Sequence, residues 1–369
     1  MPGAHAASAG VGQDRDQQSA TVMLFRGPGL PHAPRTVRLP SPAGDEALVA
    51  IELATVCGSD VHTSLGHRVE PTPLVLGHEA VGRIVALGDP APRYSDGRPA
   101  EVGDRVVWSL AVRCGSCDRC ARGIPQKCRS LRKFGHERFQ RAWELSGMFA
   151  THALLPAGSA IIPVPIDVPS SVLAPAGCGI ATARAGLRAA ERVVGLDGAS
   201  VLVTGGGLIG LAACAMASER GAVVTLSDPA PGRRSLGLDF GATRVEDPGD
   251  RDPAAEYDVV IDASGAGSAL AAGLDALAVG GAAVWIGSVF PSAPLPVAAE
   301  RVVRGLATIT GVHNYAPIDL EDSVAFLRRS WSRFPFAELV GARFPLDDLD
   351  SALARAAEQR EVRVGVVPG

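Results

Sequence analysis

The chain has 369 residues, of which 47% are hydrophobic and 20% charged, and its formal net charge at pH 7 is -4. This length suggests about two domains, and this composition excludes a predominantly disordered protein. A negative net charge argues against a nucleic-acid-binding protein, which normally carries an overall positive field. No apolar run approaches the roughly 18 residues that span a bilayer. Residues 1–20 show no signal-peptide pattern and are expected to be a disordered N-terminal extension. We therefore expect a cytoplasmic protein with no nucleic-acid or membrane partner.

Three residues far apart in the chain are candidates for an open metal site. Cys57 follows an alternating apolar segment over residues 48–53, His78 lies in a Gly-His-Glu sequence, and Cys178 is flanked by glycines. Two thiolates and one imidazole would leave one of zinc's four positions free for a substrate, as catalytic zinc requires. Their spacing alone does not show that they converge, and a buried thiol beside a core histidine is the alternative interpretation.

Four further cysteines are closely spaced, in the pattern Cys114-x2-Cys117-x2-Cys120-x7-Cys128. In a chain without an export signal, such cysteines are better interpreted as metal ligands than as disulfides. One loop could wrap four thiolates around a single zinc ion, and that closed shell would leave no position for substrate. The pattern predicts a structural zinc site, with free thiols or an iron–sulfur cluster as the alternatives.

From about residue 200, apolar segments alternate with Ala-rich stretches, which predicts a doubly wound parallel sheet. The predicted strands cover residues 201–204, 223–227, 258–262 and 282–287. The predicted helices cover residues 211–220 and 268–278. Cys214 lies in the first of these helices and is expected to be a small core residue.

A G-x-G-x-x-G sequence follows the first of these strands. Its residues are Gly205, Gly206, Gly207, Leu208, Ile209 and Gly210. Between a strand and a helix, with Asp228 ending the next strand, this sequence predicts dinucleotide binding. The glycines permit a tight turn and let the helix N-terminus approach the pyrophosphate. Asp228 would accept hydrogen bonds from the adenosine ribose and favour NAD, whereas Arg233 and Arg234 would favour NADP.

Taken together, these motifs resemble the zinc-dependent medium-chain alcohol dehydrogenases. The resemblance covers almost the whole chain after residue 20 and includes the segment 103–106 (Gly-Asp-Arg-Val). It implies an α/β protein in which a GroES-like, mostly-β catalytic domain is interrupted by a Rossmann domain with a doubly wound parallel sheet. The implied limits are 21–180 for the catalytic domain, with a zinc lobe at 110–137, then 181–314 for the Rossmann domain and 315–369 for the return to the catalytic domain.

The resemblance also implies roles for residues of the two metal sites. Cys57, His78 and Cys178 would hold the catalytic zinc, so that the chain would carry two zinc ions. Glu79 matches the acidic neighbour that can approach the metal, and Asp60 matches the carboxylate that orients the zinc-binding histidine. A solvated Glu79 and a helix-capping Asp60 are the alternatives.

The resemblance also implies roles for three more residues, in the reaction and in cofactor binding. Ser59 would hydrogen-bond the reacting hydroxyl group, and His62 would pass its proton onward through the cofactor ribose. Arg363 falls where some members place an arginine on the pyrophosphate. A helix-capping serine, a surface histidine and a salt-bridged surface arginine are the alternative interpretations.

The expected function is reversible hydride transfer between NAD(P) and a small secondary alcohol or ketone, in a homodimer or homotetramer. One alternative is zinc-assisted reduction of a conjugated C=C bond, as in an enone reductase. The other is a non-catalytic, NAD-sensing zinc protein.

The basic segment that leaves the zinc lobe, residues 126–137, resembles a subgroup associated with phosphonate catabolism and also cyclitol dehydrogenases. Its cationic residues are Lys127, Arg129, Arg132, Lys133 and His136. They form either a solvated loop that offsets the charge of the thiolates or a binding site for a substrate anion. A polyol, a cyclitol and an alcohol bearing phosphate or phosphonate are therefore the candidate substrates.

Overall fold

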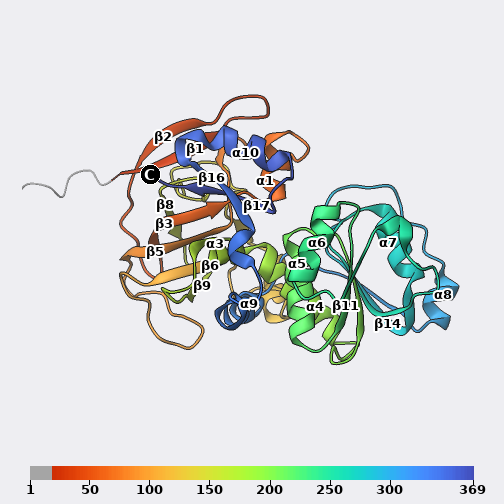
Figure 1. Ribbon diagram of the computed structural model, residues 1–369. Helices are drawn as coiled ribbons and strands as arrows, with labels where there is room; N and C mark the ends of the chain where they lie inside the picture. The colour runs from red at the N-terminus through yellow and green to blue at the C-terminus, as the bar shows by residue number, and fades with distance from the viewer. Residues whose placement is uncertain (1–18) are drawn as a thin grey trace, which may run out of the picture.

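The computed structural model describes residues 19–369. Two parts lie side by side in Figure 1: a β-rich part built from both ends of the chain, and an α/β part built from its middle. We refer to them as the first part and the second part. The expected extension, residues 1–20, lies outside the described residues except for Ser19 and Ala20. These two residues already belong to the first strand, β1 (Ser19–Phe25), in which Ala20 is buried.

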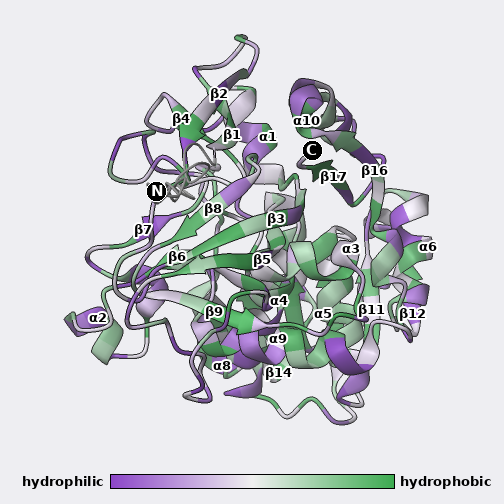
Figure 2. Cartoon of the chain, turned by 90° about the vertical axis from the view of Figure 1, so that its left-hand side faces the viewer, coloured by the Kyte–Doolittle hydropathy of each residue, from purple (hydrophilic) through white to green (hydrophobic). Residues whose placement is uncertain are grey.

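The first part is organised around an eight-stranded sheet. The order along its main path is β16-β17-β3-β5-β6-β7, with β8 paired to β3 and β9 paired to β6. Its strands are β3 (Ala47–Thr55), β5 (Ala80–Leu87), β6 (Arg105–Val112), β7 (Arg132–Lys133), β8 (His152–Leu155), β9 (Ser159–Pro163), β16 (Val340–Pro345) and β17 (Arg363–Val367). Figure 2 shows hydrophobic residues along β3, β5 and β6. A separate three-stranded sheet contains β1, β2 (Ala33–Arg38) and β4 (Leu74–Val75).

The C-terminal strands return to this first sheet. The last strand, β17, pairs antiparallel with β3, so that Gly365 lies opposite Thr55 and Val366 opposite Ala54. The sheet is therefore completed by segments about 310 positions apart in the chain, and a side chain at the start of β17 reaches the loop that follows β3. The domain limits at 180 and 314 stay a prediction, and the first of them falls inside the helix α4 (Gly179–Glu191).

The second part contains a six-stranded parallel sheet in the order β12-β11-β10-β13-β14-β15. Its strands are β10 (Ser200–Thr204), β11 (Val223–Ser227), β12 (Arg244–Glu246), β13 (Tyr257–Asp262), β14 (Leu277–Trp285) and β15 (Thr308–Gly311). Strands predicted from apolar runs match β10, β11 and β13 closely. The predicted helix 268–278 was too long, because α7 ends at Asp275 and β14 begins at Leu277.

Helices occur in both parts of the molecule, and some of them cover the second sheet (Figure 1). The helices are α1 (Gly58–Ser64), α2 (Asp118–Ala121), α3 (Ser170–Leu173), α4 (Gly179–Glu191), α5 (Leu208–Glu219), α6 (Pro231–Asp239), α7 (Gly267–Asp275), α8 (Ala299–Arg304), α9 (Pro317–Ser330) and α10 (Leu349–Ala357). One buried cluster runs from Leu53 and Val107 in the first sheet to Val203 and Ile261 in the second. Cys214 is fully buried in this cluster, as expected. In the part of the chain that the structure describes, no helix has the length and hydrophobicity of a membrane span.

Arg105 joins β6 to the segment that precedes α3. Its Nε donates to Glu52 Oε2 (2.9 Å), its Nη1 to the carbonyls of Pro165 (2.8 Å) and Val168 (2.6 Å), and its Nη2 to Ser170 Oγ (2.8 Å). The side chain is only 6% exposed. A buried guanidinium with every nitrogen engaged fixes the position of α3 relative to the sheet.

Arg105→Ala should therefore lower the free energy of unfolding by about 3–5 kcal/mol, because it leaves two carbonyls without their donor and removes one of the two guanidinium groups that pair with Glu52. Arg83→Ala is the matched control, since Arg83 binds the same Glu52 at 3.0 Å but is 40% exposed. Its loss should cost less than about 1 kcal/mol. Urea unfolding of the two variants measures the difference, and equal costs would contradict the structural role of Arg105.

Candidate active site

Cys57 is placed by the junction between β3 and α1. It is the residue that precedes α1, and its backbone N–H donates to Asp60 Oδ2 at 2.9 Å, as in a capped helix N-terminus. The other carboxylate oxygen of Asp60 accepts from the backbone N–H of Gly77 at 3.1 Å. Asp60 is fully buried, and it thereby fixes the start of α1 against the segment that carries His78.

His78 lies in the loop between β4 and β5. Gly77 precedes it with φ +91°, and a Cβ at Gly77 would lie 2.9 Å from the backbone nitrogen of Phe149, so only glycine fits. His78 Nδ1 lies 3.5 Å from Asp60 Oδ1, and His78 Nε2 lies 3.4 Å from Ser59 Oγ. Asp60 therefore lies behind the imidazole, on the side opposite Ser59, as expected for a carboxylate that orients a metal-binding histidine.

Cys178 completes the cluster from the start of α4. Its Sγ lies 3.9 Å from Cys57 Sγ, and the ligand atoms of Cys57, His78, Glu79 and Cys178 all lie within 4.8 Å of one another. Two sulfurs bound tetrahedrally to one zinc ion at about 2.3 Å would be separated by about 3.8 Å. The donor set and its spacing therefore fit zinc.

Electrostatics favour the metal-binding form of Cys57. The hydrogen bond from Cys178 lowers the pKa of the Cys57 thiol well below its usual value, with further help from His78 and Arg363, although burial acts in the opposite direction. A thiolate is the form of cysteine that binds metals. Burial raises the pKa of Glu79, the fourth member of the cluster.

Glu79 is engaged from two sides by residues of the first sheet. Arg363 Nε and Nη2 donate to its two carboxylate oxygens at 2.9 and 3.0 Å, and Thr55 Oγ1 donates to Oε2 at 2.6 Å. The expected role of Arg363 at the pyrophosphate stays a prediction. The guanidinium lies at the right junction for it, because a Cβ on Gly179 would be 3.3 Å from Arg363 Nη2 and 2.4 Å from Leu208 Cδ2.

Ser59 and His62 lie on α1, three positions apart and so on one face of the helix. The ring of His62 packs against Phe290 at a centroid distance of 4.6 Å, and its Nδ1 lies 3.4 Å from Nδ1 of His67. Phe290 belongs to the loop after β14, so α1 meets the second part of the molecule here. Sequence reasoning missed Phe290, because a single aromatic residue in a loop carries no readable signal.

The four-cysteine lobe has the geometry of a second zinc site. Sulfur separations are 3.6 Å for Cys117 and Cys120, 3.9 Å for Cys117 and Cys128, and 3.4 Å for Cys114 and Cys128. These distances are far longer than the roughly 2.05 Å of a disulfide and are close to the edge of a zinc–thiolate tetrahedron. The lobe is built from short elements, α2 and the 3-10 turn η1 (Pro125–Lys127).

The glycine-rich loop lies between β10 and α5. Gly205 has φ +97°, and a Cβ on Gly210 would lie 1.9 Å from the Gly205 carbonyl oxygen, so both positions require glycine. Gly207 precedes α5, whose first turn is Leu208, Ile209 and Gly210. The backbone N–H groups of such a first turn have no partners within the helix and can bind a phosphate.

Asp228 directly follows the next strand, β11, beside this loop. Its Oδ2 accepts from the Gly206 N–H at 2.6 Å and its Oδ1 from the Ala230 N–H at 2.8 Å. A cavity of about 580 Å³ is lined by Gly205, Gly207 and Asp228. The cavity thus lies where the sequence predicts the adenosine half of the dinucleotide.

The two neighbouring arginines have different surroundings. Arg234 Nη1 donates to Asp247 Oδ2 at 2.9 Å and to the carbonyl of Asp228, so its charge is already paired. Arg233 Nη2 donates to the carbonyls of Gln359 and Glu361. Its Nη1 is buried with no partner among residues 19–369. Arg233 Nη1 is therefore a donor that a cofactor phosphate could engage, while Arg234 is held by Asp247 and by the Asp228 carbonyl.

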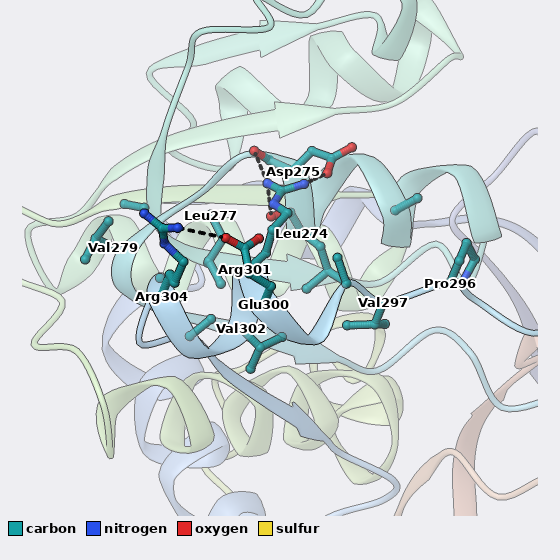
Figure 3. Close-up of a pocket in the computed structure, with 15 residues that line it drawn as sticks. Leu274, Asp275, Leu277, Val279, Pro296, Val297, Glu300, Arg301, Val302 and Arg304 are labelled. Atoms are coloured by element: carbon teal, nitrogen blue, oxygen red, sulfur yellow. Dashed lines mark hydrogen bonds and ion pairs between the residues drawn. The ribbon is translucent and has the colours of Figure 1, made fainter.

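A separate cavity of about 570 Å³ lies between the end of α7, the start of β14 and α8 (Figure 3). Its lining is largely apolar, with ion pairs of Arg301 with Asp275 and of Arg304 with Glu300. None of the candidate metal ligands borders it. It therefore provides no group for the expected chemistry.

Two sequence families match the chain. The family described as "Alcohol dehydrogenase GroES-like domain" matches residues 43–166, and "Zinc-binding dehydrogenase" matches residues 209–329. A geraniol dehydrogenase from Castellaniella defragrans is 30% identical, over 94% of this chain and 97% of the relative. These matches include the segments that contain Cys57, His78 and the lobe.

Solved structures agree in fold. An alcohol dehydrogenase from Thermotoga maritima superposes with a TM-score of 0.89 at 26% identity, covering 96% of this chain and 100% of the other. A Sinorhizobium meliloti protein described as a zinc-binding dehydrogenase and bound to NADP gives a TM-score of 0.82 at 25% identity, covering 95% and 100%. The expected fold class, a GroES-like part combined with a Rossmann-type sheet, is confirmed.

Metal analysis of the purified protein should find two zinc ions per chain. Cys117→Ser should remove one ion and lower the unfolding temperature by about 10 °C or more, because several kcal/mol of metal-binding free energy act as folding free energy at a structural site. Cys178→Ser should instead abolish turnover with a much smaller change in stability. One zinc ion per folded, active chain would contradict the assignment.

Asp228→Ala should weaken NAD binding by about 1–3 kcal/mol, because a ribose hydroxyl loses its acceptor, and should reduce discrimination against NADP. Asp228→Asn keeps one acceptor oxygen, for the Gly206 N–H or for the Ala230 N–H, and so shows how much of the loss in Asp228→Ala comes from the loop rather than from the ribose. Calorimetric titration with both cofactors gives the affinities. A wild-type protein that prefers NADP would show that Arg233 outweighs Asp228.

Proposed function

The chain belongs to the zinc-dependent medium-chain alcohol dehydrogenase family, and we propose that it oxidises a small secondary alcohol to a ketone, reversibly, with NAD as its cofactor and NADP as the alternative. The observation that carries this proposal is the convergence of Cys57, His78 and Cys178 from three separate segments. The site lies where α1 meets the loop after β14, next to the carboxyl ends of the parallel strands, where such sheets bind ligands.

Three residues would hold the zinc and leave one position for the substrate. Bound zinc would polarise the oxygen of the alcohol, and the nicotinamide would accept the hydride. Cys57, His78 and Cys178 supply three donors, while Arg363 and Thr55 already occupy the carboxylate oxygens of Glu79. We therefore assign Glu79 to the support of the site, with the fourth position left for substrate.

Ser59 and His62 would remove the hydroxyl proton. Ser59 Oγ lies beside His78 Nε2 at 3.4 Å, which places the hydroxyl next to the metal-binding nitrogen. His62 lies one turn further along α1, and its Nδ1 is 3.4 Å from that of the exposed His67. Ser59 would take the proton, His62 would receive it, and the exposed His67 would pass it toward solvent. The ribose of a bound dinucleotide would supply hydroxyl groups between Ser59 and His62.

Ser59→Ala should lower the rate of the chemical step of alcohol oxidation by roughly 10²–10⁴, the usual contribution of a positioned acid–base group. His62→Gln should have a smaller effect. Ser64→Ala is the matched control, because its hydroxyl only donates to the Val61 carbonyl at 2.9 Å in the same helix. Single-turnover formation of reduced cofactor measures the rate, with zinc content and NAD affinity unchanged. An unchanged rate in Ser59→Ala would remove Ser59 from the proton path.

An oxidation screen of neutral secondary alcohols, polyols and cyclitols, with each cofactor, tests the proposed activity itself. Product analysis with an unsaturated ketone distinguishes it from reduction of a conjugated C=C bond. Absence of turnover by the zinc-loaded protein on every alcohol would contradict the proposal. Assembly into a homodimer or homotetramer stays a prediction, which sedimentation would test.

A further inference from the structure

Three cationic side chains from different segments gather beside the candidate active site: Arg68, Lys127 and Lys133. We call them the cationic group. Arg68 follows α1, and its backbone N–H donates to the carbonyl of His62 at 3.1 Å. Lys127 ends the turn η1, and its Nζ lies 2.5 Å from Nδ1 of His313, just after β15. Lys133 lies in β7. The group therefore joins the zinc lobe, the end of α1 and the loop after β15.

The pairing of β7 with β6 places Arg132 and Lys133 on opposite faces of the strand. Successive residues of a strand point to opposite faces. The guanidinium of Arg132 lies over the ring of Trp143, 4.9 Å from its centroid, and Arg132 is exposed. Lys133 points the other way and is half-buried. Burial, and then the charges of Arg68 and Lys127, lower the pKa of the Lys133 ammonium, whereas Glu70 and Cys178 act in the opposite direction.

Contacts connect the segment that follows β7 to His78. The ring of His136 packs on that of His78 at a centroid distance of 5.2 Å. Its Nδ1 lies 3.2 Å from Glu70 Oε1, which also accepts from Arg68 Nη2 at 2.7 Å. The segment from Lys133 to His136 is thus positioned against both His78 and the end of α1.

Positive charge in this group exceeds negative charge. Glu70 pairs with Arg68, whereas the ammonium of Lys133 makes no hydrogen bond or ion pair within residues 19–369. Glu137 accepts only from the backbone N–H of Lys133, at 2.9 Å. Lys127 contacts His313, which stays neutral, because burial and then the nearby Lys127 lower its pKa to about 4. Within residues 19–369, neither ammonium forms an ion pair, and Glu70, whose charge also acts on Lys133, is already paired with Arg68.

A half-buried ammonium without a counter-charge is unfavourable unless an anion binds it. No lobe cysteine is among the charges that act most strongly on Lys133, which are those of Arg68, Lys127, Glu70 and Cys178. Within the lobe, Arg129 already has a counter-charge, because its Nε donates to Asp118 Oδ1 at 2.5 Å. A cleft of about 820 Å³ is lined by Lys127 and His313, whereas Lys133, Arg68 and the candidate zinc ligands do not border it.

We propose that the substrate alcohol carries an anionic group, a carboxylate, phosphate or phosphonate, which binds Lys133 together with Lys127 and Arg68 while the hydroxyl lies at Cys57, His78 and Cys178. This inference rests on the proposed function, because it assigns the substrate class of that same site. The inference also assigns different roles to the two adjacent basic residues of β7: Lys133 binds the substrate, whereas Arg132 does not.

The test compares charged and neutral alcohols on one enzyme. The probes are 2-hydroxypropylphosphonate, 3-hydroxybutyrate and glycerol 1-phosphate, each beside a neutral ester or amide of the same skeleton, with 2-butanol as the simplest neutral alcohol. The wild type should oxidise at least one anionic probe with a kcat/KM roughly tenfold or more above its neutral counterpart. The best anionic probe identifies which of the three groups is bound.

Lys133→Gln should lower kcat/KM for the anionic probe by roughly tenfold or more, mainly through KM, and leave 2-butanol within about twofold. Arg132→Gln is the matched control from the same strand and should change neither substrate. Arg68→Gln gives a second variant from another segment, and thermal unfolding shows whether each variant folds.

Equal losses on charged and neutral substrates in Lys133→Gln, or a wild type that prefers neutral alcohols, would overturn the anion inference while leaving the proposed function intact. Failure of the zinc-loaded wild type on every probe, 2-butanol included, would instead overturn the proposed function. The two failures are therefore distinguishable.

Discussion

The buried carboxylate of Asp60 is the contact on which the candidate active site depends. It accepts from the backbone of Cys57 and of Gly77 and faces His78 Nδ1. One side chain thus fixes the start of a helix, the loop after a short strand and the orientation of an imidazole. Because Asp60 is fully buried, these contacts form in a low-dielectric environment, where such hydrogen bonds are strong and their loss is costly.

The return of the chain to the first sheet adds a second constraint. β17 pairs with β3, and this pairing brings Arg363 onto Glu79, beside Cys57. The cluster consequently contains a buried cation–carboxylate pair next to two thiols. The last strand therefore supplies the cation that pairs with Glu79 at the site.

Local sequence patterns restrict the geometry of part of this site. The lobe cysteines lie within one short segment, and the glycine-rich loop lies between a strand and a helix, so spacing alone restricts their geometry. The strand that ends at Asp228 could be predicted because buried parallel strands are continuous apolar runs. Predictions failed at boundaries: the segment 276–278 continues an Ala-rich pattern, yet pairing with β13 draws Leu277 into β14. Ser19 and Ala20 likewise join β1, because pairing with β2 extends the strand.

The sequence by itself determined which residue types are present for metal and dinucleotide binding, because those patterns depend on neighbours in the chain. The tertiary structure alone decided how distant groups combine. Cys57 and Cys178 lie 3.9 Å apart between their sulfurs only because separate segments meet. The difference between Arg132 and Lys133 arises from the pairing of β7 with β6, which sends adjacent side chains to opposite faces. Pairing between remote segments sets these positions, and no local spacing records it.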